Sequence, residues 1–98
     1  MNQKEVIINT LIGLVGWMDE SAGQARSRSE GAKKVAARYR DRPEEFAADA
    51  SYEGYAEGKA VIAENTMRFL MGRAAGFDDC LVKLKDIIEE FNSEEVTP

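Results

Sequence analysis

The sequence predicts an all-α protein, a small bundle of about four helices with one long central helix, which forms oligomers. Apolar residues recur at helical spacing in four stretches, only two prolines interrupt the 98 residues, and no stretch alternates polar and apolar residues as a strand does. A chain of this length makes one domain with a modest core. We expect a single helical domain over 1–92 and a flexible tail over 93–98.

The first predicted helix covers about 3–20. Ile7, Leu11 and Met18 recur along one helical face, and Asn2 with Glu5 three residues later resembles a capping box. Residues 21–31, with the sequence SAGQARSRSEG, are small and polar. Local propensity leaves this stretch open between helix and loop.

The second predicted helix covers about 32–40 and is basic on its outer face. Residues 26–42 hold seven basic side chains against two acidic ones, whereas the rest of the chain has a net charge of −10. A cluster of this kind could bind the phosphates of a nucleic acid or a nucleotide. An ordinary solvated face would give the same pattern. The candidate phosphate-binding residues are Arg26, Arg28, Lys33, Lys34, Arg38, Arg40 and Arg42.

The third predicted helix starts at Pro43, after Asp41 as the cap, and could continue to about Ala75. At 1.5 Å per residue it would measure roughly 50 Å, longer than a small domain. Either the helix breaks, at 51–58 or 65–66, or the fold is elongated and uses a second chain. Gly76 predicts the stop, and a fourth helix follows over about 79–92.

The stretch SYEGYAEGKA places Gly54 and Gly58 inside the predicted long helix. Each costs about 1 kcal/mol relative to alanine. The two glycines share a stripe with small and apolar residues, so we expect a neighbouring helix, from the same chain or from a second copy, to pack there. The alternative is that they mark a loop or kink. The predicted partner or self-association residues are Tyr52, Gly54, Tyr55, Gly58, Val61 and Phe69.

Catalytic chemistry has little support in this sequence. The chain has one cysteine and no histidine, which removes disulfide frameworks, the usual zinc sites and histidine-based catalysis. A metal-dependent enzyme would have to use helix carboxylates, for which the candidates are Glu53, Glu57, Glu64, Asp86, Glu89 and Glu90. A solvated face explains them equally. We therefore expect no enzymatic activity, no cofactor and no metal.

The sequence as a whole favours a protein that acts by binding a macromolecule. No apolar run approaches the ~20 residues of a membrane span, and the N-terminus lacks a signal-peptide pattern, so we expect a cytoplasmic location. A small acidic helical chain suits a regulator or inhibitor, of the kind that phages and mobile elements use against host defence proteins. Its acidic surface would compete for a basic channel on the target. Binding of nucleic acid or phosphate ligands through residues 26–42 is the alternative.

Overall fold

The computed structural model describes residues 2–48 and 53–96. It contains two long helices, α1 (Gln3–Asp41) and α2 (Tyr55–Val96), and a short 3-10 helix, η1 (Pro43–Phe46), between them. The all-α class is confirmed, but the prediction of a bundle of about four helices is wrong. Residues 21–31 are helical, so the first two predicted helices are one helix.

The predicted long central helix does break. η1 and the turn that follows it separate Pro43 from the start of α2 at Tyr55, within the first of the two predicted break regions. Gly76 does not end a helix, because α2 continues through it, and α2 ends at Val96 rather than at Asn92. Of the predicted tail, residues 97–98 lie outside the described residues, and 93–96 belong to α2.

The α1 N-terminus is capped as its sequence indicated. The Asn2 Oδ1 atom accepts a hydrogen bond from the Glu5 N–H at 2.8 Å, which satisfies one of the free donors of the first helical turn. The Val6 N–H donates to the Asn2 carbonyl oxygen at 3.2 Å. Asn2 therefore acts as the N-cap from which α1 extends.

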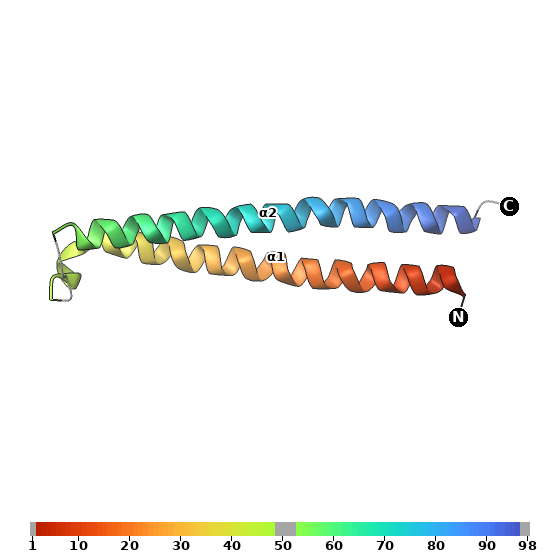
Figure 1. Cartoon of the computed structure of the whole chain (residues 1–98), viewed down its shortest axis with the longest axis horizontal. Helices are drawn as coiled ribbons and strands as arrows, with labels where there is room; N and C mark the ends of the chain where they lie inside the picture. Colours follow the sequence, from red (N-terminus) through yellow and green to blue (C-terminus); the bar gives the residue numbers. More distant parts are fainter. Residues whose placement is uncertain (1, 49–52, 97–98) are drawn as a thin grey trace. The chain divides into compact units, whose positions relative to one another are not determined.

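The chain divides into two units, each with a segment of α1 beside an antiparallel segment of α2 (Figure 1). Unit 1 contains residues 1–23 and 74–98, and unit 2 contains residues 24–73. In both units the covered residues alternate between spacings of three and four, which is the heptad pattern of a coiled coil. With Ile8 and Ala60 placed at heptad position a, most covered positions of the two helices fall at a and d. The exceptions are Ser21, Gly23, Tyr55, Gly58, Lys59 and Glu64.

Unit 1 has a seam of large apolar side chains. Leu81 is buried, and most of the other seam residues are half-buried. The Trp17 ring meets the Phe77 ring edge-on, with centroids 5.7 Å apart, at the border of this seam. The remaining large seam residues are Ile8, Leu11, Val15, Met18, Leu84, Ile88 and Phe91.

Unit 2 has a seam made mainly of alanine. Ala60 is fully covered, and Ser29, also buried, donates its hydroxyl hydrogen to the Met67 carbonyl oxygen at 3.2 Å. Small side chains at a and d let two helix backbones approach closely, which is the physical effect that the sequence predicted for the glycine stripe. The other small seam residues are Ala25, Ala32, Ala36, Ala56 and Ala63.

Side chains around η1 fix the end of α1. The Tyr39 and Phe46 rings stack with centroids 4.1 Å apart, and the Arg38 guanidinium lies 5.5 Å from the centre of the Phe46 ring. The Arg38 Nε–H also donates to Glu45 Oε2 at 3.0 Å. The turn is thus tied to the helix before it by ring contacts and an ion pair.

Candidate interaction surface

In each unit, one side of the helix pair keeps large apolar side chains in solvent. These residues occupy heptad positions g and c, which flank the seam on the same side of both helices in an antiparallel pair. In unit 1 they are Ile7, Leu14, Trp17 and Ile87, and we call them the unit 1 strip. Trp17 remains 57% exposed despite its contact with Phe77. Each of the other three is about 40% exposed.

The corresponding side of unit 2 carries Val35, Ile62 and Phe69, which we call the unit 2 strip. Phe69 is the most exposed large apolar residue in the described part of the chain, at 68%, and Ile62 is 60% exposed. Single exposed apolar residues are normal on a protein surface, whereas several of them on one side are a candidate binding surface. Each strip is such a candidate.

The opposite side of the seam, at heptad position e, is more polar in unit 2. Arg40 and Glu64 form a two-pronged ion pair there, in which Nε–H donates to Glu64 Oε2 at 3.1 Å and a second N–H donates to Oε1. The hydrogen bond from Arg40 lowers the pKa of the Glu64 carboxyl, and the same bond raises the pKa of Arg40. This side also exposes large apolar residues at e and b positions, which are Ile12 and Val82 in unit 1 and Val61 and Met71 in unit 2.

The glycine-bearing stripe of α2 does not receive α1. Instead, α1 covers the other apolar face of α2, which includes Ala60 and Met67, so the expectation of a same-chain neighbour on the glycine stripe is wrong. Val61 and Phe69 on the predicted stripe are exposed, and an added Cβ at Gly72 would meet no atom within 4 Å. The prediction that a second copy of the chain packs on the glycine stripe stays a prediction.

The remaining predicted partner residues lie at the start of α2. Gly54 precedes the helix with a φ of 81°, a left-handed conformation that glycine adopts without strain, so it serves the turn. Its carbonyl oxygen accepts the Gly58 N–H at 2.9 Å. Tyr55 is half-buried, and with Gly54 it lines a hollow of about 380 Å³ beside η1. Tyr52 lies outside the described residues.

The predicted phosphate-binding residues do not form one patch. Arg38 and Arg42 both bind Glu45, and these hydrogen bonds, from Arg38 first, lower the pKa of that carboxyl. Arg40 is held by Glu64 on the e side. The other four, all exposed, lie at different heptad positions, with Arg28 at g, Lys34 at f, and Arg26 and Lys33 at e.

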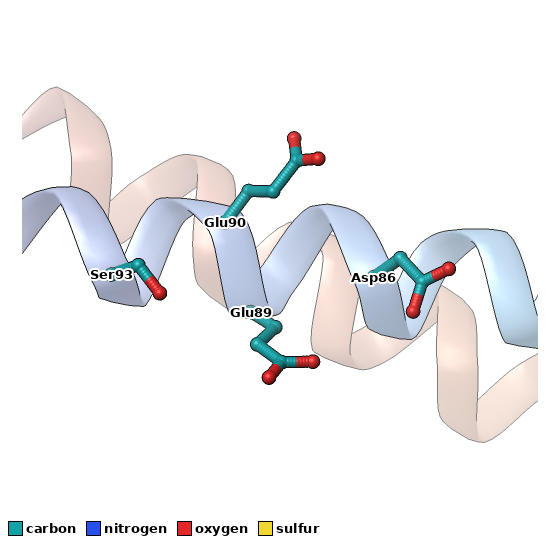
Figure 2. Close-up of a pocket in the computed structure, with 4 residues that line it drawn as sticks. All are labelled: Asp86, Glu89, Glu90 and Ser93. Carbon is teal, nitrogen blue, oxygen red and sulfur yellow. The ribbon is translucent and has the colours of Figure 1, made fainter.

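The candidate metal ligands do not converge either. Asp86, Glu89, Glu90 and Ser93 line a hollow of about 530 Å³ beside α2, but Figure 2 shows the Glu89 and Glu90 carboxylates pointing away from each other. Glu64 is committed to Arg40. Among residues 2–48 and 53–96, no group of three or more histidine, cysteine or carboxylate side chains is placed to hold a metal ion.

Sequence reasoning missed most of the two strips. It named Phe69, but placed the self-association surface around Gly54 and Gly58 rather than at Ile62, Val35 and the unit 1 strip. The signal that could have found them is the heptad spacing, because the residues just beside a covered a/d seam are the ones that remain in solvent. Reading alanine as a seam residue reveals that spacing over the whole of α1.

Comparison with known proteins adds no functional information. No family model matches the sequence, and no curated protein or solved structure shows a match to it. In the described part of the chain, neither helix has a stretch apolar enough to cross a membrane.

Proposed function

We propose that this chain is a non-enzymatic protein that acts by binding another protein. The observation that carries the proposal is the row of uncovered large apolar side chains beside each seam, above all Phe69 and Ile62 in unit 2 and Trp17 in unit 1. Removing such side chains from water is the main source of free energy in protein association. Exposed aromatic residues are also enriched among the side chains that dominate binding energy.

The thin core supports the same proposal. The buried apolar residues among those described are five alanines and two leucines, and no large side chain is fully covered. Small domains with little buried apolar area gain stability from oligomerisation or from a partner. A protein partner on the strips would supply the area that the alanine seam of unit 2 lacks.

Binding of phosphate ligands has weaker support. Three of the seven candidate basic side chains contact glutamates, and the others lie at three different heptad positions. A phosphate-binding surface needs its cations together, because affinity grows with the number of phosphates that it neutralises. We therefore keep protein binding as the conclusion.

A regulator or inhibitor is the finer form of this proposal. Unit 1 has three basic and ten acidic side chains, a net charge of −7, and would be attracted to a basic surface on a target. Complexes formed in this way weaken as salt screens the charges. If the affinity of the captured complex does not change with salt concentration, the regulator form of the proposal is wrong, whereas the proposal of protein binding still stands.

Affinity purification from the cells that express the chain tests the proposal. The wild-type chain and an Ile62→Ser/Phe69→Ser variant are used as baits, and the retained polypeptides are compared. Both substitutions fall on exposed positions, so the variant keeps its helix content while it loses partners that the wild type retains. An Ile12→Ser/Met71→Ser variant, changed at exposed e positions, is the matched control. Equal retention by wild type and variant would contradict the role of the unit 2 strip.

A further inference from the structure

The g and c positions of unit 2, which carry the unit 2 strip, hold positive charge only. We call the surface that these positions form within 24–41 and 55–73 the strip side of unit 2. All residues of these two ranges are described by the structure, and none at g or c is acidic. An apolar strip on this side therefore lies among cations alone. The basic residues of the strip side are Arg28, Arg38, Lys59 and Arg73.

The e and b positions on the other side of unit 2 have mixed charge. This side also exposes large apolar residues, Val61 and Met71. Exposed apolar side chains thus occur on both sides, but only the strip side surrounds them with one sign of charge. The charged residues at e and b are Glu30, Glu57 and Glu64, which are acidic, and Arg26, Lys33, Arg40 and Arg68, which are basic.

Positive charge is present at both ends of the strip side. Arg28, toward one end, is exposed. Lys59, at the other end, holds its ammonium group 5.5 Å from the centre of the Tyr55 ring, a contact that leaves its charge in place. Arg38, near Lys59 on this side, is already paired with Glu45. Arg28 and Lys59 are therefore the cations on which the argument depends.

The middle of the strip side is formed by small residues. The Ser29 hydroxyl donates to the Met67 carbonyl oxygen, so these two residues lie at one level of the antiparallel helix pair. Gly31 at c and Thr66 at g lie close to that level. An added Cβ at Gly31 would meet no atom within 4 Å. A helix laid along this side has room to place an apolar side chain there, as a knob enters a hole in a coiled coil.

We propose that the strip side of unit 2 binds an amphipathic helix of another protein, one whose apolar stripe is bordered by acidic residues. The apolar stripe packs on Ile62 and Phe69, and the acidic borders meet the cations at the two ends. Lys59 and Arg73 are 14 residues apart in α2, about 21 Å, which a helix of about four turns covers. This inference rests on the proposed protein-binding function and names the class of partner.

Extended polyanions fit this side less well than a short acidic helix. The whole chain has a net charge of −5, so an anionic membrane or a nucleic acid would repel most of its surface. A short helix presents its charge to the strip side alone, and salt screens charges beyond about 10 Å. Phosphate groups would also leave the apolar side chains of the strip in water.

Fluorescence polarisation with synthetic peptides and the full chain tests the inference. The probe is a helical peptide of about 18 residues with leucine at a and d and glutamate at the bordering e and g positions. A second peptide has lysine in place of each glutamate. We expect the glutamate peptide to bind with an affinity that falls as salt rises, and the lysine peptide to bind at least about tenfold more weakly.

Serine substitutions test the apolar contact. Ile62→Ser/Phe69→Ser raises the Kd of the glutamate peptide by about tenfold or more. Val61→Ser/Met71→Ser, which removes two exposed apolar residues from the other side of the same unit, leaves the Kd within about threefold of wild type. Circular dichroism on each variant checks that the helix content is retained.

Charge reversals test the basic ends. Arg28→Glu/Lys59→Glu raises the Kd of the glutamate peptide by about tenfold at low salt. Lys33→Glu/Arg68→Glu, on the other side, changes the net charge by the same amount and leaves the Kd within about threefold of wild type. The difference between the two variants reports the local charge of the strip side, because their total charge is equal.

Three results would overturn the inference. The first is equal binding of the two peptides, or no binding of the glutamate peptide at low salt. The second is binding of phosphatidylserine vesicles or duplex DNA without binding of the peptide, which assigns the strip side to a polyanion. The third is a dimer in sedimentation equilibrium that Ile62→Ser/Phe69→Ser dissociates and the peptide does not, which assigns it to a second copy. The proposed function fails on a different result, equal retention of polypeptides by the wild-type and Ile62→Ser/Phe69→Ser baits.

Discussion

The glycines of this chain provide a direct test of the fold. Gly16 lies inside α1, and an added Cβ there would meet no atom within 4 Å. Gly54 also has open space around it, but its φ of 81° lies in the left-handed region. Changing each residue to alanine therefore adds the same methyl group in free space in two different backbone conformations.

The expected effects have opposite signs. In a helix interior, alanine is about 1 kcal/mol more favourable than glycine, so Gly16→Ala stabilises the chain by about that amount. At a left-handed position, a Cβ atom costs roughly 1–2 kcal/mol, so Gly54→Ala destabilises it. For a domain of this size, 1 kcal/mol corresponds to a shift of about 4–8 °C in Tm.

Urea and thermal unfolding followed by far-UV circular dichroism measure both effects. All variants are compared at one low protein concentration, because association makes Tm depend on concentration. A double variant serves as a control for additivity, since the two residues lie in different units. A Gly16→Ala chain that melts below wild type would show that the Gly16 face is covered or that α1 is interrupted there, and would refute the reasoning.

Three further predictions concern the seam, the ion pairs and metal binding. Ala60→Leu inserts a large side chain at a fully covered seam position, and we expect urea unfolding to show a loss of stability of about 1–3 kcal/mol. The control is Ala75→Leu, at an exposed position, which changes the stability by less than about 0.5 kcal/mol. The lowered pKa of Glu64 and Glu45 means that their ion pairs stabilise the fold above the ordinary carboxyl pKa of 4.5 and lose this contribution as pH falls through the lowered values. Glu64→Gln therefore has a shallower loss of stability below pH 4.5 than wild type, and an equally steep loss would contradict the assignment. Magnesium or manganese added at millimolar concentration leaves Trp17 emission and Tm unchanged, because the carboxylates of the described residues do not converge. A saturable change in either signal would contradict this prediction and indicate a metal site.

Part of the local structure could be predicted from the sequence. The all-α class follows from helical periodicity, and the α1 start follows from the Asn2 cap. The break between Pro43 and Tyr55 was one of two alternatives, and helix length is not its cause, because α1 with 39 residues and α2 with 42 are both longer than the predicted helix over 43–75. The proposed interaction surface was only partly predictable. Phe69 was identified, while Ile62 and the unit 1 strip were not.

The sequence by itself determined that the residues at 3.5-residue spacing would lie in a seam, because heptad spacing keeps one stripe of a helix facing a partner. Only the tertiary structure decided which of the two apolar faces of α2 is covered by α1. Ala60 and Met67 occupy that face, and Val61, Phe69 and Gly72 remain outside. It also decided that glycines such as Gly31 and Gly76 do not end helices. Each glycine costs about 1 kcal/mol in a helix relative to alanine, and packing along the seam offsets this cost. Helix propensity alone contains no information about that packing.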